Sequence, residues 1–438
     1  MRRLSLITSA AVTAALALTT TGCLGTPAAT TKSTGAETAK DTVSIMYAFG
    51  GSQNDAFKKD MAAWSAKSGV KVDLIQSNSF EQLIQTKVAS GDLPDIAIFP
   101  QPGILKGLAA KGKVAELSTQ VDVAAVEKDI LPGFLGAATV DGKIYGAPMT
   151  MNVKSLYWYD KANFAAAGLT VPKTEADLEA LIDKVKATGK TPICYGMESG
   201  SATGWPGTDW IEDYMLQTNT PEVYDKWVSH EIKFDSPEVR KAFDIYTKII
   251  MTEGNVYGTA KAAASNAFAK ALNPMFDKDP KCFIGKQGNF ITQTGFFPDD
   301  VFKNLDKRVG VFVTPSVSGQ APMLGGGDLA AAFTGNDSNV KKVMNFLVND
   351  PTFGVEIAKS GAALSPHKSF DMASYPNDTT REVVKLAQAA TVFRFDGSDL
   401  MPGAVGSKSF WTGMVDYTSG NKPLDQVLTA IDKSWPEA

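Results

Sequence analysis

Strand-like and helix-like hydrophobic patterns alternate at the start of this chain, and this alternation restricts the fold more than any other feature. Residues 42–49, 71–75 and 96–99 have the apolar, β-rich composition of buried strands. Apolar residues at helical spacing fill 57–64 and 80–88, and a glycine ends each of these runs. A β-α-β-α-β order of this kind predicts a parallel sheet that is covered by helices on both faces.

The same kind of pattern returns later in the chain. Thr174 begins a predicted helix, with Asp177 placed to complete a capping box, and further helices are predicted from Ser236 and over 340–347. With 438 residues, the chain is long enough for two such sheets. Ligands bind at the carboxyl ends of strands in open parallel sheets, and pockets form preferentially between lobes. The alternation therefore predicts an α/β protein, while a cleft between two lobes does not follow from periodicity alone.

The composition excludes several classes of function. The 43 basic and 47 acidic residues give a formal net charge of -4, so no basic surplus exists to neutralise phosphates and we expect no nucleic-acid partner. The chain has only two histidines and three cysteines, so few residues could form a zinc site or a histidine-dependent catalytic triad. The sequence contains no G-x-S-x-G, H-E-x-x-H or EF-hand motif. We therefore expect no catalytic residues, no bound metal and no cofactor.

The N-terminus has the pattern of an export signal. Arg2 and Arg3 precede an apolar run over 4–18, and a short stretch that ends in Cys23 follows. This pattern predicts a signal peptide over 1–22 that is removed before Cys23, whose sulfur then carries a lipid. Ordinary secretion and a retained signal anchor are the alternatives.

The segment after Cys23 has the composition of a flexible tether. Residues 24–41 contain one leucine and no aromatic residue, so they cannot bury enough surface to fold. We assign 23–41 to a lipidated cysteine and its tether, and the later residues to the globular part. The protein is then expected on the outer face of a membrane, which it contacts through the lipid anchor only.

Two cysteines, Cys194 and Cys282, remain after Cys23. Disulfides are stable outside the cell, so we predict that these two cysteines pair. In the chain-entropy account, closing a loop of this length stabilises the fold by about 4–5 kcal/mol. The alternative is a pair of buried free thiols, and in both cases the role is structural.

Several stretches resemble a known family. Residues 91–100, 141–161 and 309–333 look like the first ligand-facing strand and two lobe crossovers of the extracellular solute-binding proteins of bacterial ABC importers. The resemblance is to the carbohydrate-binding, maltose-binding-like group of that family, and it extends over nearly all of 42–438. Three further stretches are similar to the α-glucoside-type binding proteins within the group: 192–216, 281–298 and 394–402.

The resemblance implies a two-lobed α/β clamp in which each lobe is a mainly parallel sheet flanked by helices, with three hinge crossovers. Lobe one then comprises 42–149 plus 320–362, and lobe two comprises 150–319 plus 363–438. It further implies a monomeric, non-enzymatic receptor that is lipid-anchored on the extracellular face of the bacterial cell membrane. Hinge closure captures the ligand, and the closed form docks on the transmembrane subunits of an ABC permease.

The resemblance also implies an α-linked oligosaccharide as the ligand, either an α-glucoside or an α-galactoside, with 1,6-linked sugars included. Two alternatives remain, a receptor for another solute such as a peptide and a lipid-anchored glycosidase. A glycosidase would need two carboxyl groups about 5–10 Å apart across the bond that it cleaves. Asp396 and Asp399 are the pair that it would use.

A sugar site needs carboxylates, amides and arginines for the hydroxyl groups, and aromatic rings for the C–H faces. Trp205 and Asp209 lie in a loop-like stretch, where Trp205 can stack on a sugar and Asp209 can accept from hydroxyl groups. Arg394 is expected to hold Asp396 and Asp399 in place while their free oxygens bind hydroxyl groups. The alternatives are a tryptophan packed under a loop, a helix-capping aspartate and a salt bridge that closes a loop.

The remaining ligand candidates lie near predicted strand ends and crossovers: Gly326, Gly327 and Asp328; Gln53; Gln101; and Asn152 with Trp158. The glycines let the backbone approach a ligand, or else form a plain turn. The two glutamines follow the first and third predicted strands of lobe one, at the carboxyl ends where a cleft would lie. The last pair lies near the first crossover.

Overall fold

The computed structural model describes residues 37–317, 319 and 321–436. The predicted signal peptide, Cys23 and the part of the predicted tether before Glu37 lie outside the described residues. No helix within these ranges is both long and apolar enough to span a bilayer.

The first sheet has five strands, and it contains the predicted β-α-β-α-β unit. Its strands in spatial order are β2 (Lys71–Gln76), β1 (Thr42–Tyr47), β3 (Ile96–Phe99), β12 (Leu329–Ala332) and β6 (Ala147–Pro148). β1 pairs in parallel with both β2 and β3, which confirms the predicted parallel arrangement in this region. β12 is antiparallel to β3 and to β6, so the complete sheet is mixed.

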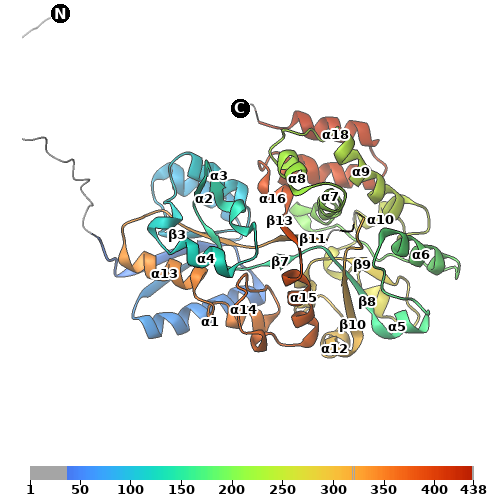
Figure 1. Cartoon of the computed structure of the whole chain (residues 1–438), viewed down its shortest axis with the longest axis horizontal. Helices are drawn as coiled ribbons and strands as arrows, with labels where there is room; N and C mark the ends of the chain where they lie inside the picture. The colour runs from blue at the N-terminus through green and yellow to red at the C-terminus, as the bar shows by residue number, and fades with distance from the viewer. Residues whose placement is uncertain (1–36, 318, 320, 437–438) are drawn as a thin grey trace, which may run out of the picture. The chain divides into compact units, whose positions relative to one another are not determined.

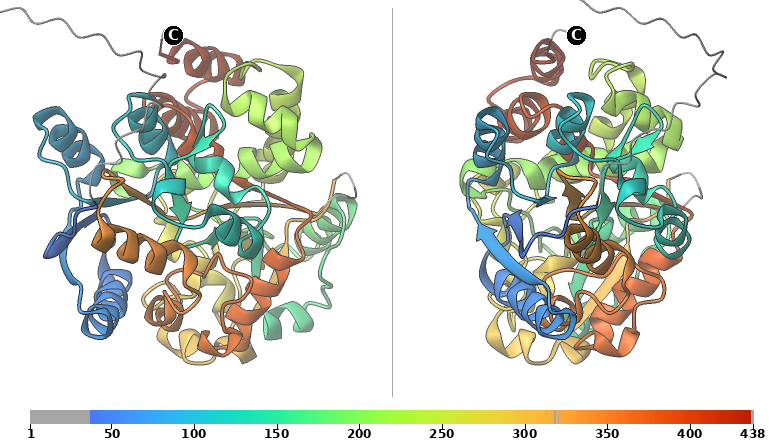
Figure 2. Two further views of the ribbon diagram at one scale, coloured as in Figure 1. Left: turned by 60° about the vertical axis from the view of Figure 1, so that its left-hand side comes forward. Right: turned by 90° about the vertical axis from the view of Figure 1, so that its left-hand side faces the viewer.

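Helices cover both faces of this sheet (Figures 1 and 2). α1 (Gly51–Ser68) and α13 (Ser338–Asn349) lie together on one face, where Trp64 stacks on Phe346 with 5.1 Å between ring centroids. α2 (Phe80–Ser90) and α3 (Pro102–Ala110) lie on the other face. α1 and α2 are expected on opposite faces of the sheet. The crossover through α1 runs outward from β1 to β2, and the crossover through α2 runs back from β2 past β1 to β3. Because both crossovers are right-handed, their opposite directions place the two helices on opposite faces.

The second lobe contains a three-stranded sheet whose order is β10 (Val309–Val313), β8 (Leu156–Asp160) and β9 (Ile284–Lys286). Both of its ladders are antiparallel, so the prediction of a mainly parallel sheet in each lobe is wrong here. β8 lies just after the chain leaves the first sheet, and β10 lies just before the chain returns to it. Strands that enter and leave a lobe at the same end run in opposite directions, which explains the antiparallel pairing.

A third sheet links the two lobes. It consists of β13 (Val392–Phe395), β11 (Pro322–Gly326) and β7 (Asn152–Val153). Residues 149–151 connect β6 to β7, residues 327–328 connect β11 to β12, and Met151 forms an isolated bridge with Leu364. The α/β clamp with two lobes is thus present, and we propose that the lobe boundaries predicted near 150, 320 and 363 fall at these links.

The core of the second lobe is built around α7 (Trp205–Thr218), which is buried from Pro206 to Gln217. Figure 1 shows α7 end-on, with α8 (Pro221–Val228), α9 (Pro237–Tyr246) and β13 around it. The fully buried Trp210 packs against Tyr157 and Tyr195 at centroid distances of 5.7 and 5.9 Å. Further elements are α4 (Val123–Asp129), α5 (Lys161–Ala166), α6 (Glu175–Lys186), α10 (Ala260–Ala263), α11 (Asp299–Phe302), α12 (Leu305–Arg308), α14 (Val355–Ser360), α15 (Asp378–Gln388), α16 (Gly397–Leu400), α17 (Trp411–Thr418), α18 (Leu424–Lys433), β4 (Thr139–Val140) and β5 (Lys143–Ile144).

The predicted helix starts are present where the sequence placed their caps. The Thr174 hydroxyl accepts from the Asp177 backbone at 3.2 Å, and the Asp177 carboxylate accepts from the Thr174 backbone at 3.0 Å, which completes the capping box of α6. Ser236 caps α9 by accepting from the Val239 backbone at 3.4 Å. These contacts are local, and local contacts are what a sequence pattern predicts best.

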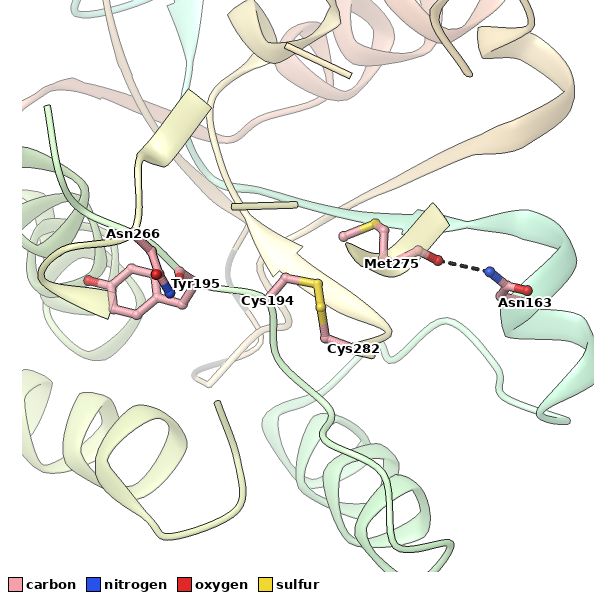
Figure 3. The surroundings of a disulfide bond; sticks show 6 residues. All are labelled: Asn163, Cys194, Tyr195, Asn266, Met275 and Cys282. Atoms are coloured by element: carbon pink, nitrogen blue, oxygen red, sulfur yellow. Dashed lines mark hydrogen bonds between the residues drawn. A yellow bond between two sulfur atoms is a disulfide. The ribbon is translucent and has the colours of Figure 1, made fainter. Parts of the chain in front are cut away.

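Cys194 and Cys282 form the predicted disulfide, with 5.3 Å between their Cα atoms. The bond joins the segment after α6 to the start of β9 within the second lobe (Figure 3). Beside it, Asn163 donates to the Met275 carbonyl at 2.8 Å, so the surrounding loops are also tied to α5. Both sulfur-bearing residues are buried, at 1% and 0% exposure.

The folded body begins a few residues earlier than predicted. Asp337 is fully buried and caps α13 with one carboxylate oxygen, so its second oxygen requires donors. The Thr38 hydroxyl and the Lys40 backbone supply them, at 3.0 and 2.8 Å. The tether predicted over 23–41 therefore ends before Thr38.

Candidate functional site

A cleft of about 950 Å³ lies between the two lobes. α2 and α3 form one wall, and residues 201–202, α16 and residues 403–411 form the other. The lining includes Glu81, Gln85, Gln101, Asp399, Lys408 and Trp411. This volume lies at the upper end of the range that small-molecule sites usually occupy.

Lys154 is the centre of a buried group of charges under the second wall. Its side chain is 12% exposed, and its Nζ donates to Asp209 Oδ1 at 2.9 Å and to Asp396. Lys154 follows β7, Asp209 lies in the first turns of α7 and Asp396 caps α16. Glu212, one turn further along α7, accepts from the Ser398 backbone at 3.1 Å. The group therefore ties three separate elements together beneath the cleft.

Burial and the shared lysine move the pKa values of these carboxyl groups in opposite directions. Burial raises the pKa of Asp209 to about 7, although Lys154 acts against it. Burial also raises the pKa of Glu212 and of Asp399 well above the ordinary range. Asp396 is equally buried, but the attraction of Lys154 outweighs burial and holds the pKa of Asp396 below its ordinary value. The ammonium group of Lys154 therefore pairs mainly with the ionised carboxylate of Asp396.

The same carboxyl groups have a spacing that a metal ion could use. One oxygen of each of Asp209, Glu212 and Asp396 lies within 4.8 Å of the other two. Lys154 already bonds two of the three, so the positive charge that they require is supplied by the protein itself. We therefore assign no metal to this group.

The structure brings the three predicted aspartates together but gives Arg394 another partner. Asp209 and Asp396 are 6% and 2% exposed, while Asp399 lies partly open on the wall of the cleft. Arg394 makes a two-point pair with Asp225 of α8, at 2.8 and 2.9 Å. The prediction that Arg394 fixes Asp396 is therefore wrong. Asp396 turns inward to cap α16, where Lys154 takes that role, and Arg394 reaches outward to α8.

The two predicted tryptophans have different surroundings. Trp158 is fully buried and its Nε1 donates to the Gln287 carbonyl at 2.7 Å, which contradicts the predicted ligand contact. Its strand β8 lies in the middle of its sheet with both faces covered. Trp205 is half-buried at the start of α7, with an edge contact to Phe268 and with Lys154 Nζ 5.1 Å from its ring centroid. Trp205 therefore lies over the buried charge group.

Gln53 and Asp328 meet at the link between β11 and β12. Gln53 Nε2 lies 3.5 Å from Asp328 Oδ2, and the Thr150 hydroxyl donates to the same oxygen at 2.5 Å. Gly326 ends β11, and a Cβ on Gly327 would lie only 2.1 Å from the Thr150 carbonyl oxygen. Glycine is thus required here because two segments of the protein backbone approach each other, and the predicted approach to a ligand is not needed to explain it.

The buried Asp328 predicts a pH dependence of stability. Burial raises its pKa in the fold to about 6, whereas an unfolded chain titrates near the ordinary value of about 4. Protonation thus favours the fold, and this contribution is complete below the unfolded pKa and is lost as the pH rises through about 6. In the wild type, Asp328 should make the free energy of unfolding fall by about 2–3 kcal/mol between about pH 4 and pH 7. We expect this contribution to be absent in Asp328→Asn. Urea denaturation of both proteins across this range measures it, and parallel curves would contradict it.

Two predicted amides carry a buried oxygen that has no hydrogen-bond partner in the described part of the chain: Gln101 Oε1 and Asn152 Oδ1. Asn152 lies in β7, where its backbone pairs with Gly326. Gln101 directly precedes α3 and lines the cleft. A buried acceptor without a donor costs free energy, so Gln101 is suited to accept a hydrogen bond from a ligand.

Several residues of the site were not among the sequence-based candidates, and Trp411 and Lys154 are the two that matter most here. Trp411 lines the cleft, and its buried Nε1 has no acceptor among the described residues. Nothing in the local sequence distinguishes Trp411 from the tryptophans of the core. Lys154 had a usable signal, because a lysine in the otherwise strand-like run over 152–160 indicates a buried partner.

Residues with hydrogen-bonding side chains line both walls of the cleft. Gln101 Oε1 on the first wall is an acceptor, and Trp411 Nε1 on the second is a donor. The pKa of Asp399 on the second wall is raised by desolvation and by the nearby charge of Asp396, so Asp399 is suited to donate as well as to accept. This set of groups fits a neutral ligand with several hydroxyl groups better than a fixed ion.

Two curated relatives that match most of this chain are named as binding proteins. AglE of Rhizobium meliloti, an alpha-glucosides-binding periplasmic protein, is 35% identical over 404 residues and covers 90% of this chain and 87% of its own. The osmoprotective compounds-binding protein GgtB of Synechocystis sp. is 38% identical over 397 residues, with 90% and 92% covered.

A solved structure has the same fold, and a family model matches the sequence. The bacterial solute receptor AcbH, whose structure reports a preference for β-D-galactopyranose, matches with a TM-score of 0.75 at 15% identity and covers 90% of this chain and 98% of its own. The family model for bacterial extracellular solute-binding proteins matches residues 50–353. From this match and the two curated relatives, the chain belongs to the family of bacterial extracellular solute-binding proteins.

Proposed function

We propose that this protein captures a sugar in the interlobe cleft and delivers it to an ABC permease. The observation that carries the proposal is that Gln101 and Trp411 line opposite walls of the cleft, and that Gln101 Oε1 and Trp411 Nε1 are buried without a partner among the described residues. A sugar hydroxyl both donates and accepts, so sugars suit an acceptor on one wall and a donor on the other. Capture needs only ground-state binding, which agrees with a receptor that does not change its ligand.

An α-linked oligosaccharide, an α-glucoside or an α-galactoside with 1,6-linked sugars included, is the ligand that we propose. The name of the Rhizobium relative supports the α-glucosides, and the volume of about 950 Å³ leaves room for more than one sugar ring. We propose direct contacts by Gln101, Asp399 and Trp411. Further candidates act from beneath or beside the cleft: Trp205, Asp209, Asp396, Asn152, Gln53, Gly326, Gly327 and Asp328.

The setting of this receptor is also part of the proposal. We propose that Cys23 carries a lipid after removal of 1–22, and that the monomer is held on the extracellular face of the bacterial membrane beside its permease. The motif at 1–23 and the family membership support this arrangement. Asp396 is buried and bonded to Lys154, which argues against a glycosidase pair of Asp396 and Asp399.

Calorimetry of the mature protein tests the proposed ligand class. We expect binding of at least one α-glucoside or α-galactoside with a dissociation constant of order micromolar, and a raised melting temperature in its presence. A β-linked disaccharide and a tripeptide are the comparison ligands. Chromatography after incubation should recover intact sugar. Binding of the peptide alone, or cleavage of the sugar, would contradict the proposal.

Trp411 is expected to contribute to the affinity in two separable ways. Trp411→Phe removes the Nε1 donor but retains a ring, and we expect it to weaken binding by about 0.5–1.5 kcal/mol. Trp411→Ala also removes the ring and should weaken binding by about 1–3 kcal/mol. Trp435→Phe is the matched control, because Trp435 stacks on His230 away from the cleft. Equal affinities for Trp411→Ala and the wild type would show that Trp411 does not contribute to binding and has only a structural role.

A further inference from the structure

The walls of the cleft touch at Gly103 in the first turn of α3. A Cβ built on Gly103 would lie 2.9 Å from the Met401 carbonyl oxygen, 3.2 Å from that of Leu400 and 3.3 Å from that of Asp399. These three carbonyl groups form the end of α16. Contacts under 3.0 Å are not tolerated by a real side chain, and backbone atoms cannot rotate away. The α3–α16 contact therefore depends on the missing side chain of Gly103.

This contact joins parts that belong to different lobes. α3 follows β3 directly and packs on it, so it moves with the first sheet. α16 packs against α8, and the Ser398 backbone within it is bonded to Glu212 of α7, so it moves with the second lobe. The N-terminal end of α3 carries a partial positive charge and faces the carbonyl oxygens that end α16, so the two ends attract each other. Opening of the lobes must break this contact, and closing must restore it.

The contact also sets the separation of the groups that face the ligand. Gln101 lies two residues before Gly103, and Asp399 is itself one of the three residues that Gly103 meets. Both line the cleft. A side chain at position 103 would push α3 and α16 apart, and this would increase the separation of Gln101 and Asp399.

We propose that Gly103 is a positioning residue for closure: its bare backbone lets the two walls approach to the distance at which both bind one ligand. This inference rests on the proposed capture of a ligand in the cleft, but the contact itself is measured without any ligand. Gly103 is not proposed to contact the ligand itself. It acts by setting the positions of Gln101 and Asp399.

The same helix supplies a matched control. Gly107 lies one turn further along α3 and also lines the cleft, but a Cβ built on it meets no atom within 4 Å. Neither glycine has a left-handed backbone, so alanine and valine fit the local conformation at both positions. Alanine also favours a helix over glycine, so substitution at either position should not weaken α3. A difference between the two positions therefore reports the α3–α16 contact alone.

Small-angle X-ray scattering of the mature protein without added sugar gives the first readout. We expect a larger radius of gyration for Gly103→Val than for the wild type, with Gly103→Ala between them, and an unchanged value for Gly107→Val. Thermal unfolding of the four variants, including Gly107→Ala, shows that all are folded. If Gly103→Val unfolds early, Gly103→Ala carries the comparison. Equal scattering at positions 103 and 107 would overturn the inference.

Calorimetry with a sugar that the wild type binds gives the second readout. We expect affinity to fall at least tenfold in Gly103→Val, with the melting temperature of the unliganded variant near that of the wild type. An affinity within twofold of the wild type would overturn the inference. If no sugar binds even the wild type while the scattering difference is present, the proposed function fails and the role of Gly103 in closure stands.

Discussion

Lys154→Met is expected to lower the free energy of unfolding by about 3–5 kcal/mol, because removal of one partner leaves buried charge without compensation. Lys154 is 12% exposed, and its two partners Asp209 and Asp396 have side chains that are 8% and 3% exposed. Methionine has a similar length and fills the same space, so the loss reports the missing charge and not a cavity. Urea denaturation at about pH 8 of the wild type and the variant measures it.

The loss caused by Lys154→Met should depend on pH in a defined direction. Without the ammonium, burial raises the folded pKa values of Asp209 and Asp396 above their unfolded values. Protonation then favours the fold, so the variant keeps most of its stability at low pH and loses it as the pH rises through those raised values. We expect a smaller difference from the wild type at about pH 5 than at about pH 8.

Lys190→Met is the matched control for this experiment. Lys190 pairs with Asp279 at 2.7 Å, but the two side chains are 37% and 71% exposed. Exposed pairs of this kind contribute about 0–1 kcal/mol. Similar losses for Lys154→Met and Lys190→Met, or a loss at Lys154 that does not change with pH, would show that the buried charge group is not what holds α7, β7 and α16 together.

The buried charge group also shows how far a sequence can predict a site. Asp209, Asp396 and Asp399 were predicted from loop-like stretches that contain residues suited to hydroxyl groups, and the structure brings them together. The sequence signal at Lys154 indicates a buried partner but not which one, since Lys154 lies 55 residues from Asp209 and 242 from Asp396. Arg394 is adjacent in the sequence and was the natural choice, but strand and cap geometry direct it to α8.

For the same reason, the sequence predicts the first lobe more accurately than the second. β1, α1, β2, α2 and β3 follow one another, so hydrophobic period and glycine ends define them locally. β8, β9 and β10 lie next to each other only after long excursions of the chain, and their antiparallel pairing has no local signal. Trp158 and Trp411 illustrate the consequence, because both lie in apolar stretches while only Trp411 faces the cleft.

Removal of the disulfide should be the other large effect on stability. The double variant Cys194→Ala, Cys282→Ala opens a loop that spans 88 residues, and the chain-entropy account gives a loss of about 4–5 kcal/mol. We expect a melting temperature lower by roughly 5–6 °C for a chain of this size. Differential scanning calorimetry of the wild type and the double variant, each with and without a thiol reductant, measures the change.

The reductant is the control that separates the bond from the side chains. It should destabilise the wild type about as much as the double substitution does, and it should leave the double variant unaffected. Cys194 and Cys282 both lie within the second lobe and neither lines the cleft, so ligand affinity should be unchanged below the melting transition. A loss of affinity in the folded double variant would mean that the bond holds the cleft wall in place, whereas equal melting of all samples would mean that the surrounding packing alone fixes these loops.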